Sequence, residues 1–319
     1  MKLIKPKFWD KNYLTFQSLL LYPLTFIIDL RNIITFFEKP KKYTQIKTIC
    51  IGNIYLGGTG KTPLVSFLAK KLKNKFKTII IKKKYQSHLD EKKLLENYNK
   101  VLFDDDRVLS LSKAIDKKFE LAIFDDGLQD KKIEYDLKIA CFNSISLAGN
   151  ELRLPSGPLR ERLNNLKRYD AVFISGKPVD KIFLKKIKKI NPKIEIFNGE
   201  YVPTNYKKFK KKNYMTFSGI GNPLGFAQTL NKYGIKSVSN LIYPDHYEYS
   251  ETEINKIKKL ANKKKLKILT TEKDFCRIPI ELRKNISFLK IEIRINNLKK
   301  FNRFLSKYLW KKLNIFLNF

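Results

Sequence analysis

The sequence predicts an α/β protein built from two units, each a parallel β-sheet covered by helices. Short apolar runs alternate with helical patterns along the chain, as in parallel sheets whose strands are joined by crossover helices. The alternation is interrupted near residues 192–212 and then starts again. A length of 319 residues also allows two domains with separate cores.

The strands and helices of each unit follow from this apolar periodicity. In the first unit we expect strands at 46–51, 78–81, 101–103, 121–124, 137–142 and 171–174, with helices at 64–72, 108–115 and 159–166. In the second we expect strands at 214–217 and 268–270, a helix ending at Gly234, and a helix opened by a capping box, Ser250 to Glu253. A basic amphipathic helix at about 298–316 closes the chain. The predicted domains are residues 1–44, 45–200 and 201–319.

Residues 1–44 are predicted to form a membrane-associated helical segment. Residues 13–28 are almost uninterrupted apolar and aromatic, with lysines on both sides. The run is shorter than the about 20 residues that span a bilayer, and Pro23 would kink a helix within it. We expect a half-inserted or marginal transmembrane anchor, and a helix packed against its own domain is the alternative.

Composition narrows the class of partner. The net charge is +36, and lysines spread along the whole chain carry most of it, so the pattern does not favour a nucleic-acid partner. A solvated lysine surface and attraction to an anionic lipid surface or polyanionic substrate both remain open. The three cysteines are far apart, which predicts a reducing compartment without disulfides or structural zinc. We expect a monomer.

A glycine-rich loop lies between a predicted buried strand and a predicted helix. It reads Tyr55-Leu56-Gly57-Gly58-Thr59-Gly60-Lys61-Thr62, with Tyr55 where the standard pattern has glycine. Glycines let backbone N–H groups turn inward around phosphates, the lysine can reach the β- and γ-phosphates, and the threonine hydroxyl can ligate Mg²⁺. We therefore predict that this P-loop binds ATP and that Thr62 holds magnesium.

Acidic clusters follow two of the predicted strands. Asp125 and Asp126 end the strand at 121–124 in the manner of a Walker B element, where a carboxylate beside a P-loop can hold Mg²⁺. Asp104, Asp105 and Asp106 follow the strand at 101–103. Their repulsion would raise the pKa of at least one carboxyl, which suits a proton acceptor, whereas a helix N-terminus would explain them as caps. The residues leave both interpretations open.

Two further positions are candidate site residues. His246 follows Asp245 at a predicted strand end, an arrangement in which a carboxylate fixes the tautomer of an imidazole. Arg160 follows two prolines and a glycine, and we expect it in the first turn of a helix, facing an anionic group.

In this order, the motifs resemble those of the tetraacyldisaccharide 4′-kinase family, the bacterial lipid A 4′-kinases. The similarity extends from about Asn32 to Asp274. Its elements are Ile51-Gly52-Asn53, Gly57-Gly58-Thr59-Gly60-Lys61-Thr62-Pro63, Asp125-Asp126-Gly127-Leu128-Gln129, Leu154-Pro155-Ser156-Gly157-Pro158-Leu159-Arg160-Glu161, Gly219-Ile220-Gly221-Asn222-Pro223, Tyr243-Pro244-Asp245-His246 and Thr270-Thr271-Glu272-Lys273-Asp274.

The resemblance implies two α/β/α lobes, the first P-loop NTPase-like, with an N-terminal hydrophobic membrane-anchoring helix. It implies a kinase on the cytoplasmic face of the bacterial inner membrane. That kinase would transfer the γ-phosphate of ATP, with Mg²⁺, to the 4′-hydroxyl of a tetraacylated glucosamine disaccharide 1-phosphate, giving lipid IVA. Its partners would be this lipid disaccharide and the membrane surface.

Roles carry over by matching motif positions. Lys61 and Thr62 would engage the phosphates and Mg²⁺, and Arg160 would belong to the conspicuous loop at the nucleotide. Asp125, Asp126 and Gln129 would form the Walker B region. Asp105 is the best match for the catalytic base, and His246 would support its basicity.

The chain departs from the family pattern at three places. The family's Arg-Gly-Tyr-Gly is Lys83-Lys84-Tyr85-Gln86 here, and its Gly-Asp-Glu-Pro is Asp104-Asp105-Asp106-Arg107. The histidine that follows the family's Walker B glutamine is Asp130. A membrane-associated P-loop ATPase that acts as a switch or positioning factor is the alternative function, and it would release only free phosphate.

Overall fold

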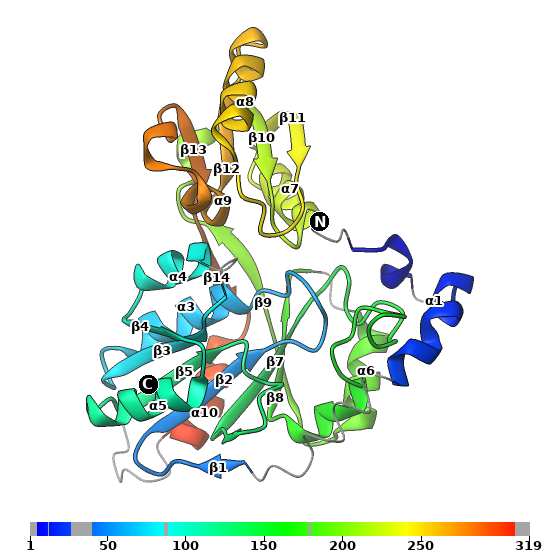
Figure 1. Cartoon of the computed structure of the whole chain (residues 1–319), viewed down its shortest axis with the longest axis vertical. Coiled ribbons are helices and arrows are strands. Elements are labelled where there is room, and N and C mark those ends of the chain that lie inside the picture. Colours follow the sequence, from blue (N-terminus) through cyan, green and yellow to red (C-terminus); the bar gives the residue numbers. More distant parts are fainter. Residues whose placement is uncertain (1–4, 12, 27–39, 86–88, 178–179, 310–319) are drawn as a thin grey trace. The chain divides into compact units, whose positions relative to one another are not determined.

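The computed structural model describes residues 5–11, 13–26, 40–85, 89–177 and 180–309 (Figure 1). They form two compact units. The P-loop unit comprises Lys5–Lys84, Asn99–Glu200 and Arg294–Phe319, and the second unit comprises Tyr85–Tyr98 and Tyr201–Ile293. The division differs from the predicted ranges at three places. The described residues before residue 45 belong to the P-loop unit and do not form a unit of their own. Helix α4 (Leu89–Glu96) belongs to the second unit because it packs against α9 (Glu272–Arg277), and the last helix, α10 (Leu298–Leu309), returns to the P-loop unit.

The P-loop unit is built on one large sheet with the strand order β14-β9-β8-β7-β2-β5-β3-β4. All pairings from β4 across to β9 are parallel. The strands are β2 (Lys47–Gly52), β3 (Thr78–Lys83), β4 (Val101–Asp104), β5 (Leu121–Asp125), β7 (Leu137–Asn143), β8 (Ala171–Ser175), β9 (Glu195–Pro203) and β14 (Ile291–Ile295). The six predicted strands are confirmed, whereas β9 and β14 were not predicted. A short parallel pair, β1 (Lys41–Lys42) and β6 (Ile133–Glu134), lies outside this sheet.

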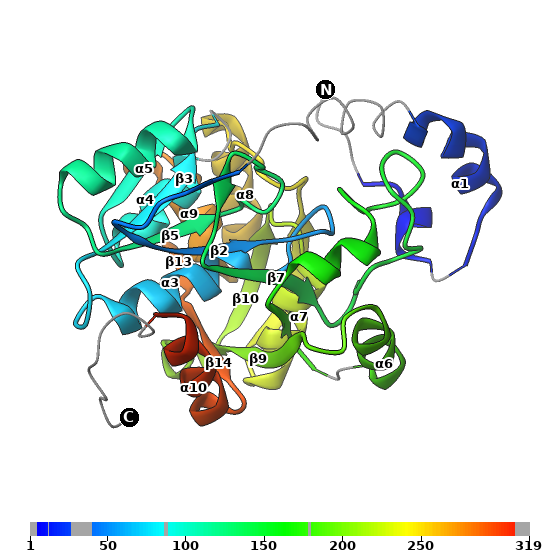
Figure 2. The same ribbon diagram turned by 90° about the horizontal axis from the view of Figure 1, so that it is seen from below.

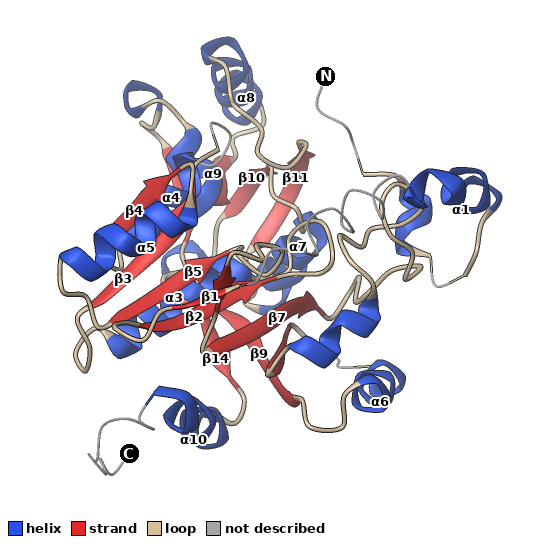
Figure 3. Cartoon of the chain, turned by 60° about the horizontal axis from the view of Figure 1, so that its bottom comes forward, coloured by secondary structure: helices blue, strands red, loops and turns tan. Residues whose placement is uncertain are grey.

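Helices cover both faces of the large sheet (Figures 2 and 3). Alternate strand residues point to opposite faces. Val172 of β8 lies in the buried cluster of α6 (Lys181–Ile190), whereas its neighbour Phe173 meets Phe301 of α10 edge to face. Helix α5 (Arg107–Asp116) covers a second cluster, which includes strand residues of β2, β3 and β5, and α3 (Lys61–Leu72) lies on the α10 face.

The second unit has a smaller parallel sheet with the order β11-β10-β12-β13. Its strands are β10 (Asn213–Ser218), β11 (Lys236–Ile242), β12 (Lys267–Thr271) and β13 (Ile286–Leu289). Helix α8 (Glu251–Lys263) buries Ile254 and Ile257 on one face, and α7 (Pro223–Lys232) buries Phe226 on the other. The predicted capping box of α8 is confirmed.

Short helical turns complete the described elements: η1 (Lys7–Asp10), α1 (Phe16–Leu21), η2 (Tyr22–Leu24), η5 (Leu163–Arg168), η6 (Tyr206–Phe209) and η7 (Ile280–Leu282). Of the apolar run at 13–28, the last two residues lie outside the described part, as do residues 310–316 of the predicted final helix. Within the described residues, no helix is both long enough and apolar enough to cross a bilayer. The anchor stays a prediction.

Candidate active site

The P-loop connects central strand β2 to helix α3. Its turns need glycine, since Gly57 and Gly60 have φ angles of 118° and 85°. Side chains hold the carbonyl groups from outside: Asn53 Nδ2 donates to Gly57 O at 3.3 Å, and Asn143 Nδ2 donates to Gly58 O at 3.0 Å. A carbonyl and the next N–H point in opposite directions across a trans peptide. The N–H groups that follow these carbonyls are therefore turned to the inside of the loop.

Helix α3 begins at the end of this loop. Its N-cap residue is Gly60, which has no side chain to bond the first N–H groups of the helix. Lys61 is the first helical residue and Thr62 the second. Unbonded N–H groups at a helix N-terminus attract an anion. The loop and helix together therefore form a cradle suited to phosphate.

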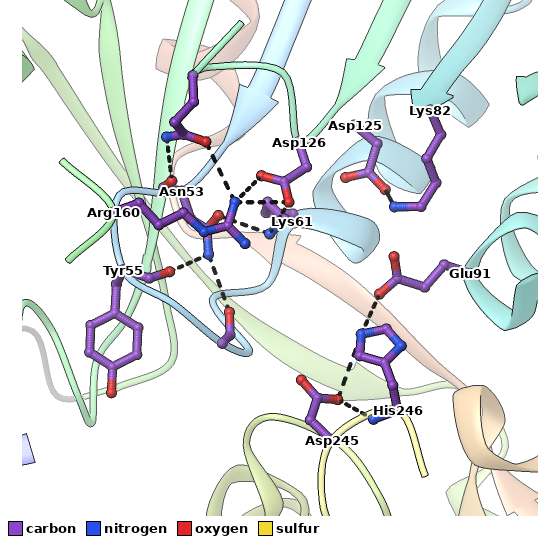
Figure 4. A network of polar contacts seen from close by, with 12 residues as sticks. Asn53, Tyr55, Lys61, Lys82, Glu91, Asp125, Asp126, Arg160, Asp245 and His246 are labelled. Carbon is purple, nitrogen blue, oxygen red and sulfur yellow. Dashed lines mark hydrogen bonds and ion pairs between the residues drawn. The ribbon is translucent and has the colours of Figure 1, made fainter. Parts of the chain in front are cut away.

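Asp126 joins the two cations that face this cradle (Figure 4). Its Oδ2 lies 3.2 Å from Lys61 Nζ, and Arg160 Nη1 donates to both of its oxygens at 2.8 and 3.0 Å. Lys61 Nζ also donates to Asn53 Oδ1 at 2.9 Å. Burial alone would raise the pKa of Asp126, but the nearby charges, Lys61 first, hold that pKa well below its ordinary value. Asp126 is therefore an anion at neutral pH.

Asp125 forms a different kind of pair. It ends β5, and its Oδ2 lies 2.7 Å from the ammonium of Lys82 in the neighbouring strand, with both side chains almost fully buried. Its other oxygen, Oδ1, is buried and has no hydrogen-bond partner among the described residues. An orphaned carboxylate oxygen fits a divalent cation. The described residues contain no cluster of three or more acidic, histidine or cysteine ligands, so hydroxyl, phosphate or water oxygens would complete the shell.

The remaining predicted nucleotide-binding residues, Tyr55, Leu56 and Gln129, lie in or beside the P-loop. The ring of Tyr55 is 1% exposed, and its hydroxyl is bonded to Asp10, so only its backbone faces the loop. The N–H of Leu56 donates to Pro158 O at 2.8 Å. Gln129 Nε2 donates to Asn53 O at 3.0 Å. A part in nucleotide binding stays a prediction for these three residues.

The predicted helix at 159–166 is wrong in its first half. Arg160 lies in a non-helical bend: its N–H donates to Ile54 O at 2.7 Å, and Leu159 pairs with Tyr55 in an antiparallel bridge. These bonds hold the chain against the strand that leads into the P-loop, so only the 3₁₀ turn η5 (Leu163–Arg168) is helical. The guanidinium of Arg160 does meet an anion, the carboxylate of Asp126.

The structure separates the three adjacent aspartates by their contacts. Asp106 caps α5 through a 2.6 Å bond from the Val108 N–H, and Asp104 accepts bonds from Ser110 and Lys113 at 3.0 Å. The Val108 bond lowers the pKa of Asp106, and in Asp104 the bonds from Lys113 and Ser110 outweigh burial and lower the pKa. These two carboxyls therefore do not show the raised pKa that was expected of at least one of the three. Asp105 is exposed, and its carboxylate has no hydrogen bond or ion pair among the described residues.

In the second unit, His246 faces Glu91 and not only Asp245 (Figure 4). Its Nε2 lies 3.7 Å from Glu91 Oε1 and 3.9 Å from Asp245 Oδ1. Asp245 instead accepts the backbone N–H of His246 at 3.0 Å. Lys273 Nζ lies 2.7 Å from Glu91 and 3.3 Å from the imidazole. The carboxylate nearest to the ring is thus that of Glu91 on α4, which the sequence interpretation missed.

Lys82, Asn53 and Asn143 were also missed. A lysine directly after Ile79-Ile80-Ile81 is a weak signal, since a charge that continues a buried strand needs a counter-charge. The two asparagines carry no comparable local signal, because their contacts are with loop carbonyl groups.

Comparison with known proteins places this site in a family. The model of the LpxK family, described as tetraacyldisaccharide-1-P 4′-kinase, matches residues 17–310. The chain belongs to this family. The tetraacyldisaccharide 4′-kinase of Pelagibacter ubique (strain HTCC1062) is 47% identical over 312 residues, which are 96% of this chain and 98% of the relative. That of Rickettsia canadensis (strain McKiel) is 33% identical over 335 residues, with 99% of both chains covered.

A solved LpxK structure shares the fold. It is the "apo" form of LpxK from Aquifex aeolicus in complex with ATP, with a TM-score of 0.69 and 23% sequence identity. The match covers 92% of this chain and 99% of the other. The predicted LpxK resemblance and the predicted α/β fold with parallel sheets are both confirmed.

Proposed function

We propose that this chain transfers the γ-phosphate of ATP to the 4′-hydroxyl of a tetraacylated glucosamine disaccharide 1-phosphate, giving lipid IVA. The observation that carries the proposal is the convergence of Lys61, Arg160 and Asp126 beside an uncapped helix N-terminus, in a chain of the LpxK family. Phosphoryl transfer needs little more from a protein than phosphate positioning and charge stabilisation.

ATP is the expected donor. The inward N–H groups of the P-loop and the first turn of α3 bind phosphate oxygens, and Lys61 supplies a cation at the same place. Arg160 is a second cation within reach of the same anions, since it shares the Asp126 carboxylate with Lys61. Two fixed cations stabilise charge that develops on the transferred group.

The residues present fit magnesium. Asp125 Oδ1 is the orphaned oxygen, and Asp126 and the Thr62 hydroxyl complete the predicted protein ligands. Held by these residues, Mg²⁺ would neutralise charge on the phosphates. Lys82 keeps the second oxygen of Asp125 occupied, so this carboxylate offers a single oxygen to the cation.

Asp105 is the proposed base. The acceptor's 4′-oxygen forms a bond to the γ-phosphorus, the bond from that phosphorus to the β–γ bridging oxygen breaks, and ADP leaves with the electron pair. The hydroxyl proton passes to the Asp105 carboxylate, which is exposed while those of Asp104 and Asp106 are committed to α5. We also propose that His246 supports this step.

We also propose that the protein docks on the cytoplasmic face of the bacterial inner membrane. The surface of helix α1 supports this proposal. It exposes Phe16, Leu19 and Leu20 at 78%, 57% and 68%, and it buries Ser18, which meets Asn150 Nδ2 at 3.0 Å. A helix that buries its polar residue and exposes its apolar ones is the reverse of an ordinary surface helix. An interface of acyl chains and anionic headgroups suits both this apolar face and the many lysines.

Vesicle sedimentation tests the membrane proposal. Phe16→Ser with Leu20→Ser is expected to weaken binding to anionic vesicles, and salt is expected to weaken the part that lysines contribute. Ile182→Ser is the control, because Ile182 is 79% exposed on another helix, α6. Equal binding by all three proteins would contradict the proposal. We also propose that the protein is a monomer, and its mass in detergent tests this.

A transfer assay tests the kinase proposal. Labelled γ-phosphate is expected to appear on the disaccharide lipid in detergent, and Lys61→Ala is expected to prevent this. Release of free phosphate alone, with lipid present and the protein folded, would favour a P-loop ATPase switch and reject the kinase.

A further inference from the structure

Arg107 connects the aspartate cluster to the Walker B turn. It is the first residue of α5, two positions after Asp105, and only 8% of it is exposed. Its Nη2 donates to the carbonyl oxygen of Asp126, and its Nη1 lies 3.2 Å from Asp130 Oδ2. Its Nε is buried without a partner among the described residues. The two Nη contacts are therefore what holds this buried cation in place.

Asp126 needs such support because its backbone is strained. Its φ is 62°, in the left-handed region that non-glycine residues avoid. Such a conformation costs about 1–3 kcal/mol and persists only where the surroundings determine it. The Asp126 N–H is held by Ile51 O at 2.8 Å, and Arg107 holds its carbonyl group. Because both the N–H and the carbonyl group of Asp126 are held, its carboxylate points at Lys61 and Arg160.

Asp130 stabilises the buried charge of Arg107. A buried guanidinium is costly without a counter-charge. The Asp130 carboxylate, 18% exposed, supplies that charge, and its backbone N–H donates to Gly127 O at 3.0 Å within the same turn. Among the described residues, Asp130 makes no direct contact with the Asp126 carboxylate. Asp130 therefore acts on that carboxylate through Arg107.

These two residues are also two of the departures from the family pattern, which has proline and histidine at the corresponding positions. Proline at the first position of a helix fixes the backbone there. In this chain an arginine stands at that position of α5, and an acidic residue stands opposite it. The two departures meet as one ion pair in this structure.

We propose that Arg107 and Asp130 are positioning residues for phosphoryl transfer, which tie the start of α5 to the strained Asp126 turn and thereby aim the Asp126 carboxylate. The inference rests on the proposed function. It predicts an ordered dependence: Arg107 acts on Asp126 directly, and Asp130 acts only through Arg107.

Turnover per folded molecule of full-length protein tests this dependence. Arg107→Met is expected to lower kcat by about 10- to 100-fold, since small misplacement of a site group costs that much. Asp130→Asn is expected to lower kcat less, because the bond to the Asp126 carbonyl group remains. The double variant should be no slower than Arg107→Met. Multiplicative losses, or an unchanged kcat in Arg107→Met, would overturn the inference.

Lys47→Gln is the matched control. Lys47 forms a half-buried pair with Asp136 at 3.2 Å, at the end of β2 away from the P-loop. Its loss is expected to lower the urea midpoint without lowering kcat. If its kcat falls as far as that of Arg107→Met, the effect is one of stability and the positioning role is rejected.

A second pair of variants remains informative if Arg107→Met does not fold. Proline is tolerated at the first helical position, so Arg107→Pro with Asp130→His is expected to turn over faster than Arg107→Pro alone. The reverse order would contradict the inference. Turnover is measured both as lipid phosphorylation and as free phosphate released. If wild-type protein releases only free phosphate, the proposed function fails, and the same ordered losses in that release would still support the positioning role.

Discussion

Replacement of Lys82 by methionine is expected to destabilise the P-loop unit strongly. Lys82 Nζ lies 2.7 Å from Asp125 Oδ2, and the two residues are 3% and 1% exposed. Methionine fills a similar volume but leaves the buried carboxylate without its counter-charge. Removing one partner of a buried ion pair costs about 3–5 kcal/mol. At roughly 2–4 °C per kcal/mol, the Tm should fall by about 6–20 °C.

Urea unfolding followed by circular dichroism measures this loss. Lys42→Gln is the control, because its pair with Glu134 is half exposed and should contribute about 1 kcal/mol or less. Lys82→Met with Asp125→Leu should recover most of the lost stability, since a buried pair can be replaced by apolar residues of similar volume. The same double variant should transfer no phosphate, because it lacks Asp125.

Two results would refute the reasoning. A loss of less than about 1 kcal/mol in Lys82→Met would mean that Asp125 does not depend on this cation. A double variant no more stable than the single one would mean that lost packing, and not an unpaired charge, causes the effect.

Three further predictions concern the phosphate site. Lys61→Ala is expected to abolish transfer in the labelled-ATP assay, because it removes the cation at the helix N-terminus, and clear residual transfer would argue against the P-loop role. Asp105→Asn is expected to lower turnover while nucleotide titration shows ATP binding retained, and normal turnover would move the base to Asp104 or Asp106. The folded-state pKa of Asp126 lies below its unfolded value, so its stabilising contribution is full above about pH 5 and is lost as the pH falls below about 4. Asp126→Asn should therefore lower the urea midpoint at neutral pH and much less in acid, and equal losses at both would contradict this.

Most of the strands that could be predicted are buried on both faces, and the half-buried edge strand β4 is an exception. Every residue of β5 and β8 is buried, and such strands appear in the sequence as continuous apolar runs. Strand β11 alternates between exposed and half-buried residues at a sheet edge, and β9 carries Asn198, Gly199 and Glu200 within it. Their pairing partners stabilise them, and a local pattern does not contain those partners.

The site residues divide in the same way. The P-loop and the Walker B aspartates are contiguous motifs at the end of one strand each, so their spacing alone reveals them. Lys82, Glu91 and Arg107 act through partners that are distant in sequence: Lys82 meets Asp125, Glu91 meets Lys273 and His246, and Arg107 meets Asp130.

Each of these residues carries a buried charge. This gives a rule for predicting their partners, and the present chain tests it. A buried charge must have a counter-charge, so a lysine or arginine predicted within a core element predicts an acidic residue at a neighbouring strand end or turn. Here Lys82 lies beside Asp125 because β3 pairs with β5 in parallel register, and that pairing follows from the strand order of a P-loop sheet. Arg107 begins the helix after β4, and no strand register leads to Asp130, which lies in the turn beyond Asp126. The Lys82–Asp125 pair is therefore predictable once the topology is known. The Arg107–Asp130 pair, by contrast, depends on how one turn folds back onto the start of a helix.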